Sequence, residues 1–573
     1  MTAVVETSAT GITEARLETR CSNAAGSIRT PRLVIATAAG LALVTLAWRF
    51  LTFDGFSNDH YAHLALAQQM LLGDRPVRDF YDPGWPLMYL LSAAGWRLTG
   101  NAMWTEWAIT AVAFAGAAAC TAVAAYRLSF SLPIAIAVTL LEVLIYPRSY
   151  AYPKVLAYAM AACAVLAVAA RPSAARLWGS AAVIALAFLF RHDHGLYVGA
   201  ASAIAVALAS RREGWRVARN RVAALVAAVA VCLSPWILFI VLNGGLVAYF
   251  AGGLEFARAE AGANLLRSWP RLVTLAADGP HGLVAFARAL NADAWLFWLF
   301  WILPFACGVV VCRRLASGHE RWPGELASVA ALVVLAALVN GGILRDVLQT
   351  RIPDAVVPAV LLGAWATGLC WTGAWRLRAL QITAQVAALC ILGVSTHAAG
   401  RIGQVSDRAS NAGFADGMAG VREHSTAVSR LLSGPHRQET YPPSRYSRAL
   451  LPFFAYLDRC TSPEDRLIVT GEFPDVLVLA ERGFAGDGIV FGAWYTSIAH
   501  EDRSIARIST RSTPFALLIG DSSDFRLLDS YLQRHYEPMT EIPVDGADPV
   551  RVLVQRDRPG TTTDSETGWR CFR

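Results

Sequence analysis

The feature that most constrains this chain is a succession of long apolar segments between residues 33 and 396. Only 16% of the residues are charged, whereas an average soluble chain has about 25%. Several segments are shorter than the about 17–25 residues that suit a spanning helix, and the pair 177–190 and 196–210 could be re-entrant. The sequence therefore predicts a mainly α-helical, polytopic membrane protein with about eleven transmembrane helices, at 33–51, 102–125, 130–146, 155–170, 177–190, 196–210, 222–242, 295–312, 326–344, 355–371 and 379–396.

The charges between these segments predict the orientation of the chain. Alternate loops, such as 211–221, carry arginine and little acid, whereas the opposite loops are longer or of mixed charge. Because cytoplasmic loops are enriched in Lys and Arg, the N-terminus is expected in the cytoplasm and everything after residue 397 outside it. The formal net charge of +7 is spread in short clusters without a continuous basic patch, so no nucleic-acid partner is expected.

The chain changes character near residue 398. Residues 1–32 are a polar cytoplasmic segment, 33–397 the transmembrane domain, 398–445 a polar linker and 446–573 a soluble domain. In this last part short apolar strands alternate with helix-like stretches, which is typical of a small α/β domain on the extracytoplasmic side. Strands are expected at 465–471, 514–521 and 550–556, and an amphipathic helix at 524–536. The two cysteines of the tail, Cys460 and Cys571, could pair in an oxidising compartment.

The loop after the first apolar segment is acidic. It carries five aspartates, Asp54, Asp59, Asp74, Asp79 and Asp82. Asp59 stands where the chain leaves the membrane and enters an amphipathic stretch, Tyr61 to Leu72, which could lie along the interface. A carboxylate at that place meets both water and a lipid-borne substrate. Asp59 could equally be a helix cap, because it precedes a helix.

Further outer loops supply charges close to the membrane. Arg191 and Asp193 belong to a cluster between two very apolar segments, where ionisable residues are costly and therefore candidates for function. They could also neutralise each other at a helix junction. Lys154 and Arg351, from two other outer loops, are suited to a phosphate or pyrophosphate headgroup. Each could instead be an anchor that reaches from a helix end to the interface.

Four histidines make a metal site conceivable. His192 and His194 flank Asp193, and His60 and His63 lie one helical turn apart. Imidazole is a common zinc ligand, so a divalent metal held by both loops is an open alternative. The sequence assigns no cofactor, because two separate pairs of histidines would have to converge.

These elements, in this order, resemble the membrane glycosyltransferases of the GT-C fold, in the bacterial branch related to protein O-mannosyltransferases and aminoarabinose transferases. The resemblance rests on the acidic first outer loop (NDHYAHLALAQQMLLGDRPVRDFYDPGWPLMYLL), the junction RHDHG at 191–195, the junction RIPD at 351–354 and the soluble outer tail. The first loop is the most specific of the four. The chain departs from the pattern at Val356 and Val357, where many relatives have a histidine, and at His60, where an acid is frequent.

The resemblance implies a transferase of the bacterial inner (plasma) membrane that uses a polyprenyl-phosphate-linked sugar and a carboxylate of the first loop as catalytic base. By position this base is Asp59, with Asp54 as the alternative. The acceptor would be an envelope glycan, lipid or protein. The expected substrate-binding residues are Asp54, Tyr61, Asp79, Asp82, Lys154, Arg191, Asp193, Arg351 and Asp354.

A transporter or flippase of lipid-linked glycans is the alternative function. Such a protein could hold a headgroup with the same outer arginines. It also needs polar or charged residues at mid-membrane in several helices. Apart from Glu142 the apolar segments are nearly free of them, which favours the enzyme.

Overall fold

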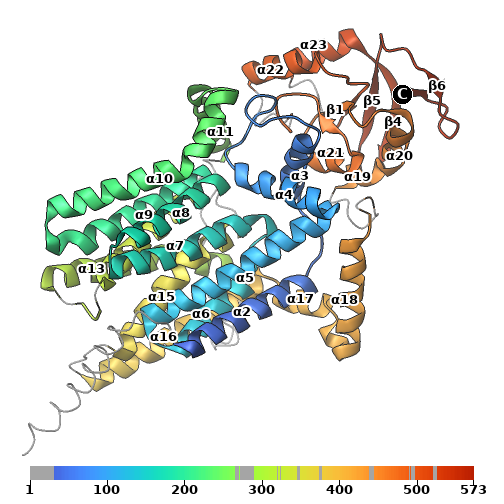
Figure 1. Ribbon diagram of the computed structural model, residues 1–573. Coiled ribbons are helices and arrows are strands. Elements are labelled where there is room, and N and C mark those ends of the chain that lie inside the picture. The colour runs from blue at the N-terminus through green and yellow to red at the C-terminus, as the bar shows by residue number, and fades with distance from the viewer. Residues whose placement is uncertain are drawn as a thin grey trace, which may run out of the picture.

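Long apolar helices form a bundle, and a mixed β-sheet lies at one end of it (Figure 1). This computed structural model describes residues 31–264, 270, 290–318, 320–322, 324–344, 349–372, 377–435, 437, 444–489, 491, 497–520 and 525–573. The predicted cytoplasmic segment 1–32 lies outside the described residues except for its last two. Eight described helices are long and apolar enough to cross a membrane. They are α2 (Arg32–Leu51), α5 (Ala102–Ser129), α7 (Tyr152–Ala170), α10 (Trp215–Asn243), α13 (Ala292–Ser317), α14 (Glu325–Ile343), α15 (Val356–Thr372) and α16 (Arg378–Ile402). Together with the 3-10 turns that precede them, α7 and α15 give spans of Ser149–Ala170 and Arg351–Thr372.

The number of predicted spans, eleven, is not confirmed. The other three segments form α6 (Leu132–Leu144), α8 (Ala174–Phe190) and α9 (His192–Ser210). Helix α6 has 13 residues and is therefore about 20 Å long, shorter than the about 30 Å hydrocarbon core of a bilayer. Helix α8 is also apolar but short, with 17 residues. Helix α9 has 19 residues, and its first turn carries His192, Asp193 and His194. These three helices pack within the bundle against the longer ones.

The acidic first loop folds into two helices between the bundle and the sheet, α3 (Asn58–Leu71) and α4 (Pro86–Thr99) (Figure 1). Gly100 ends α4 in the left-handed conformation, with φ of 71°, which glycine adopts without steric cost. The side chain of Asn101 then caps α5 by accepting a hydrogen bond from the backbone N–H of Trp104, 2.9 Å away. Helix α4 therefore turns back onto the bundle and packs against both α3 and α5.

The tail contains a five-stranded sheet with the order β2-β1-β3-β5-β4. Strand β1 is parallel to β2 and β3, whereas β5 is antiparallel to β3 and β4. The strands are β1 (Arg466–Val469), β2 (Gly483–Phe484), β3 (Phe515–Leu518), β4 (Tyr536–Val544) and β5 (Ala547–Gln555), with helices α20 (Leu451–Cys460), α21 (Pro474–Ala480), α22 (Ile498–Ile508) and α23 (Arg526–His535) around them. The three predicted strands correspond to β1, β3 and β5, and the predicted amphipathic helix to α23.

Within the described part of 398–445 the chain is largely helical rather than an open linker. It contains the end of α16, then α17 (Val405–Asn411), the 3-10 turn η4 (Phe414–Asp416) and α18 (Gly417–Ser433). Helix α18 contacts α2 and α5, and Asn101 donates a hydrogen bond to the Leu432 carbonyl at its end (3.0 Å). In the tail Cys460 and Cys571 form a disulfide, as the sequence allowed.

The tail docks on the first loop. Helix α3 packs against α21 and β2. The backbone N–H of Tyr81 donates to the Asp487 carbonyl (2.7 Å), and Asp74 forms an ion pair with Arg511 (2.9 Å). The first loop is therefore held from two sides, by the bundle below it and by the tail above it.

Candidate functional site

A cavity of about 980 Å³ lies where the bundle, the first loop and the tail meet. Five residues predicted from separate loops line it: Asp59, Lys154, Arg191, Asp193 and Arg351. Four segments far apart in the sequence therefore contribute to one cavity. Its walls also contain apolar and aromatic side chains, among them Trp85, Tyr150, Phe190 and Phe250.

Asp59 enters the cavity from the first turn of α3. The N-cap position of this helix is Ser57, so Asp59 is not the cap residue. A carboxylate in the first turn is favoured by the partial positive charge of the helix N-terminus. The neighbouring Asn58 donates a hydrogen bond to the Glu472 carbonyl of the tail (2.9 Å). The start of α3, and with it Asp59, is therefore tied to the tail.

Three cations that line the cavity come from elements other than α3. Lys154 forms a buried ion pair with Asp354, Arg191 Nε lies 3.0 Å from Asp193 Oδ1, and Arg351 Nη1 donates to the Tyr150 hydroxyl (3.4 Å). These cations and both carboxylates also line a small adjoining cavity of about 40 Å³. Three positive and two negative side chains therefore line this small cavity.

Four of the predicted substrate-binding residues, Asp54, Tyr61, Asp79 and Asp82, line neither cavity. Asp54 is exposed and pairs with Arg408 (3.0 Å). Asp79 pairs with its neighbour Arg78 (2.6 Å). Tyr61 is fully buried, in the hydrophobic cluster that joins the first loop to the tail. These positions connect the first loop to its surroundings and do not face the cavity.

Asp82 is connected to the cavity by hydrogen bonds through two side chains, Tyr249 and His192. It is buried, and burial raises the pKa of its carboxyl group. Its Oδ2 atom lies 2.8 Å from the hydroxyl of Tyr249 in α11 (Leu246–Asn264). That hydroxyl lies 2.7 Å from Nε2 of His192, which lines the cavity. Because the Phe188 carbonyl, 2.9 Å from His192 Nδ1, can only accept, Nδ1 carries a hydrogen. A continuous series of hydrogen bonds thus links Asp82 through Tyr249 to His192.

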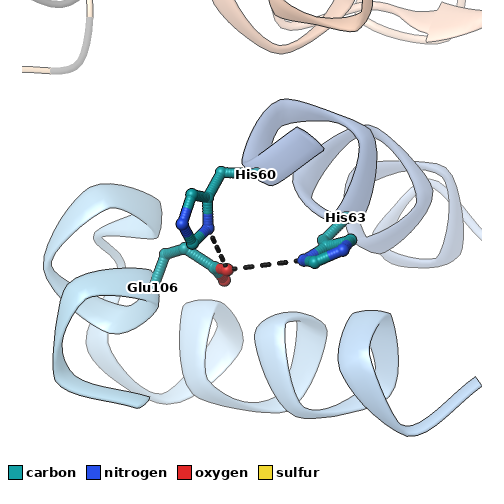
Figure 2. A group of neighbouring side chains, drawn as sticks. All are labelled: His60, His63 and Glu106. Carbon is teal, nitrogen blue, oxygen red and sulfur yellow. Dashed lines mark hydrogen bonds and ion pairs between the residues drawn. The ribbon is translucent and has the colours of Figure 1, made fainter. Parts of the chain in front are cut away.

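The two predicted histidine pairs do not converge. His192 bonds to Tyr249 and His194 to Tyr158. His60 and His63 instead face Glu106 of α5 (Figure 2). Within the described residues the groups spaced to hold a metal are His60, His63 and Glu106, and Cys460, Asp564 and Cys571, whose cysteines are in the disulfide.

The tail contributes residues that the sequence did not indicate. Glu472, Ser497, His500 and Arg503 line the cavity. Partial burial, and after it the neighbouring Asp59 carboxylate, raise the pKa of Glu472. Glu106 was missed as well, although a carboxylate inside the apolar segment 102–125 is a signal that could have found it.

Comparison with protein-family models and with curated proteins finds no match. What the cavity can do chemically therefore follows from its lining residues. It offers a carboxylate on α3, three cations from other elements, and walls with apolar and aromatic side chains. Such a site can take a proton from a hydroxyl group and hold an anion on an amphipathic molecule.

Proposed function

We propose that this chain is a glycosyltransferase that moves a sugar from a polyprenyl-phosphate donor to an acceptor in the cell envelope, on the outer face of the bacterial plasma membrane. The observation that carries this proposal is the single cavity lined by Asp59 and by the cations Lys154, Arg191 and Arg351. The fold of the membrane domain would then be of the GT-C type, as the first loop and the two junctions suggest.

In the proposed reaction Asp59 acts as the base. It removes the proton from an acceptor hydroxyl while the oxygen attacks the anomeric carbon of the sugar. The bond between that carbon and the phosphate oxygen breaks, and the polyprenyl phosphate leaves with the electron pair. A single displacement with one base inverts the anomeric configuration.

The leaving phosphate gains negative charge, so fixed positive groups stabilise the transition state. Lys154 and Arg351 are proposed for this role, with Arg191 as a third partner. Their neighbours Asp354 and Asp193 hold them in place without cancelling all of their charge. The aromatic wall, with Tyr150 and Trp85, is suited to a sugar ring or to the first isoprene units.

The test is a transfer assay with Asp59→Asn in a strain that lacks the chromosomal copy, with envelope glycans, lipids and proteins profiled by mass spectrometry. Loss of a general base is expected to lower turnover by about 10²- to 10⁴-fold. Asp407→Asn, at an exposed position on α17, is the matched control and should keep full activity. Asp54→Asn tests the alternative base and should also remain active.

An unchanged product profile in Asp59→Asn cells, at normal protein abundance, would sink the assignment of the base. If the deletion strain instead accumulates lipid-linked glycan on the cytoplasmic side, and the purified chain transfers no sugar, the protein is a flippase. That outcome would refute the transferase altogether.

A further inference from the structure

Three side chains, two from α3 and one from α5, lie close together, and one of them belongs to His60, the residue that follows Asp59. His60 and His63 lie three residues apart on α3, so both rings point from the same face of the helix. They face Glu106 near the start of α5 (Figure 2). Glu106 Oε1 lies 2.8 Å from Nδ1 of His60 and 3.6 Å from Nδ1 of His63.

This cluster is shut off from solvent. His60 and Glu106 are 0% exposed and His63 is 3% exposed. Ser92 of α4 donates a hydrogen bond to the second carboxylate oxygen of Glu106 (2.7 Å). Among the described residues the ion-pair partners of Glu106 are these two histidines, and no Lys or Arg is one of them. A buried carboxylate without a positive partner is costly, so a positive charge is required at this place.

His63 offers an unused ligand atom. Its Nδ1 is buried, points toward Glu106 and makes no hydrogen bond to the described residues. Its ring is held edge-on against Trp85, with the centroids 4.6 Å apart. A buried polar atom of this kind calls for an explanation.

We propose that His60, His63 and Glu106 bind a divalent transition-metal ion, with zinc the best fit. The three ligand atoms lie within 4.8 Å of one another. Zinc bonds of about 2.0–2.2 Å place two ligands of a tetrahedral ion about 3.4 Å apart. The two separations to Glu106 Oε1, 2.8 and 3.6 Å, lie on either side of that value.

The donor set and its surroundings support this ion. Two imidazoles and one carboxylate, with one further position for water, are a known zinc arrangement. His63 also lines the large cavity, so the cluster adjoins it. Ser92 orients the carboxylate from the second shell of atoms around the ion, as metal ligands usually require.

The ion would fasten the start of α3 to α5. Asp59 is the residue directly before His60, so the same link fixes the position of the cavity carboxylate. This proposal concerns metal binding and does not rest on the transferase activity. The competing explanation is that a proton on one histidine supplies the positive charge, with no metal.

The test is the metal content of the full-length chain, purified in detergent with a tag that contains no histidine. Zinc is measured by inductively coupled plasma mass spectrometry after dialysis, and about one equivalent per chain is expected. His63→Ala and Glu106→Gln should lose this zinc. His424→Ala, a histidine on α18 outside the cluster, is the matched control and should retain it.

A second measurement remains decisive if those variants fail to fold. Co²⁺ is exchanged into the native chain and into His63→Cys, whose thiolate should add a sulfur-to-cobalt charge-transfer band absent from the native spectrum. The proposal is overturned if the monodisperse native chain contains no stoichiometric zinc and its thermal unfolding does not shift when Zn²⁺ is added. That result would assign the positive charge to a proton on a histidine.

Discussion

At the scale of single residues, the ion pair of Lys154 and Asp354 is expected to contribute to the stability of the fold and, through Lys154, to the proposed phosphate binding. Lys154 is the only lysine of the chain, and both partners are buried. Lys154→Met leaves Asp354 without its partner, which should cost about 3–5 kcal/mol of stability. The double variant Lys154→Met, Asp354→Asn should recover most of that loss, because neither charge remains. Thermal unfolding in detergent measures both effects.

A transfer assay separates the structural role of this ion pair from the proposed role of Lys154 in phosphate binding. If Lys154 holds a phosphate, the double variant is stable but remains inactive. Arg78→Gln removes a cation from an exposed pair with Asp79 and should leave both stability and activity nearly unchanged, because exposed pairs contribute little. A double variant that regained transfer would show that Lys154 serves structure alone.

The candidate site was predictable from the sequence where a charge stands out against an apolar background. Lys154, Arg191 and Arg351 could be identified in that way, and all three line the cavity. Long-range contacts could not be identified in this way: the contacts of Glu106 with His60 and of Asn58 with Glu472 join residues 46 and 414 positions apart. No local pattern encodes such a contact, because it depends on how whole elements pack.

At the scale of elements, α3 is joined to the tail by the side chain of Gln69, which forms hydrogen bonds with β2 of the kind that a neighbouring strand would form. The Gln69 amide donates to the Phe484 carbonyl (3.0 Å) and accepts from the Phe484 N–H (3.1 Å), so it extends the edge of β2. Gln69 is fully buried. Gln69→Ala leaves the Phe484 N–H unsatisfied, which should cost about 1–3 kcal/mol, whereas the Phe484 carbonyl keeps a hydrogen bond from Arg511 (3.3 Å). Hydrogen exchange at β2 should accelerate, as measured by mass spectrometry.

Gln533→Ala is the control for this variant. Gln533 is exposed on α23 and bonds only within its own helix, to Asp529 (2.8 Å), so exchange at β2 should not change. If Gln69→Ala leaves β2 equally protected, the amide does not support the docking of the tail on α3.

The secondary structure was predictable where a whole strand is buried, because most of its residues are then apolar. Strands β1 and β3 are buried at every position, and their apolar runs indicated them. Strand β4 was missed because it is an edge strand with mostly exposed or half-buried residues, and it contains Pro538 and Pro543. Proline is tolerated at a sheet edge but weakens the sequence signal of a strand.

At the scale of the whole molecule, the cavity exists only where three parts of the fold meet. The bundle supplies Lys154 and Arg351, the first loop supplies Asp59, and the tail supplies Glu472 and Arg503. The side of the membrane on which the tail lies is therefore also the side of the cavity. The arginine-rich segment 211–221 contains the 3-10 turn η2 (Arg211–Glu213) between α9 and α10 and the first residues of α10, and it is predicted to lie in the cytoplasm.

Cysteine labelling from outside the cell tests this orientation. Asp548→Cys, exposed in the tail, should react with a membrane-impermeant maleimide, whereas Arg216→Cys, exposed in the loop 211–221, should react only after the cells are lysed. Both substitutions are made in a Cys21→Ser chain, which alone gives the background, because Cys460 and Cys571 are in a disulfide and the remaining seven cysteines belong to the apolar helices. Labelling of Arg216→Cys alone in intact cells would place the cavity on the cytoplasmic face. A donor presented on the outer leaflet could not reach Asp59 there, so this single result would remove the proposed reaction while leaving the zinc site untouched.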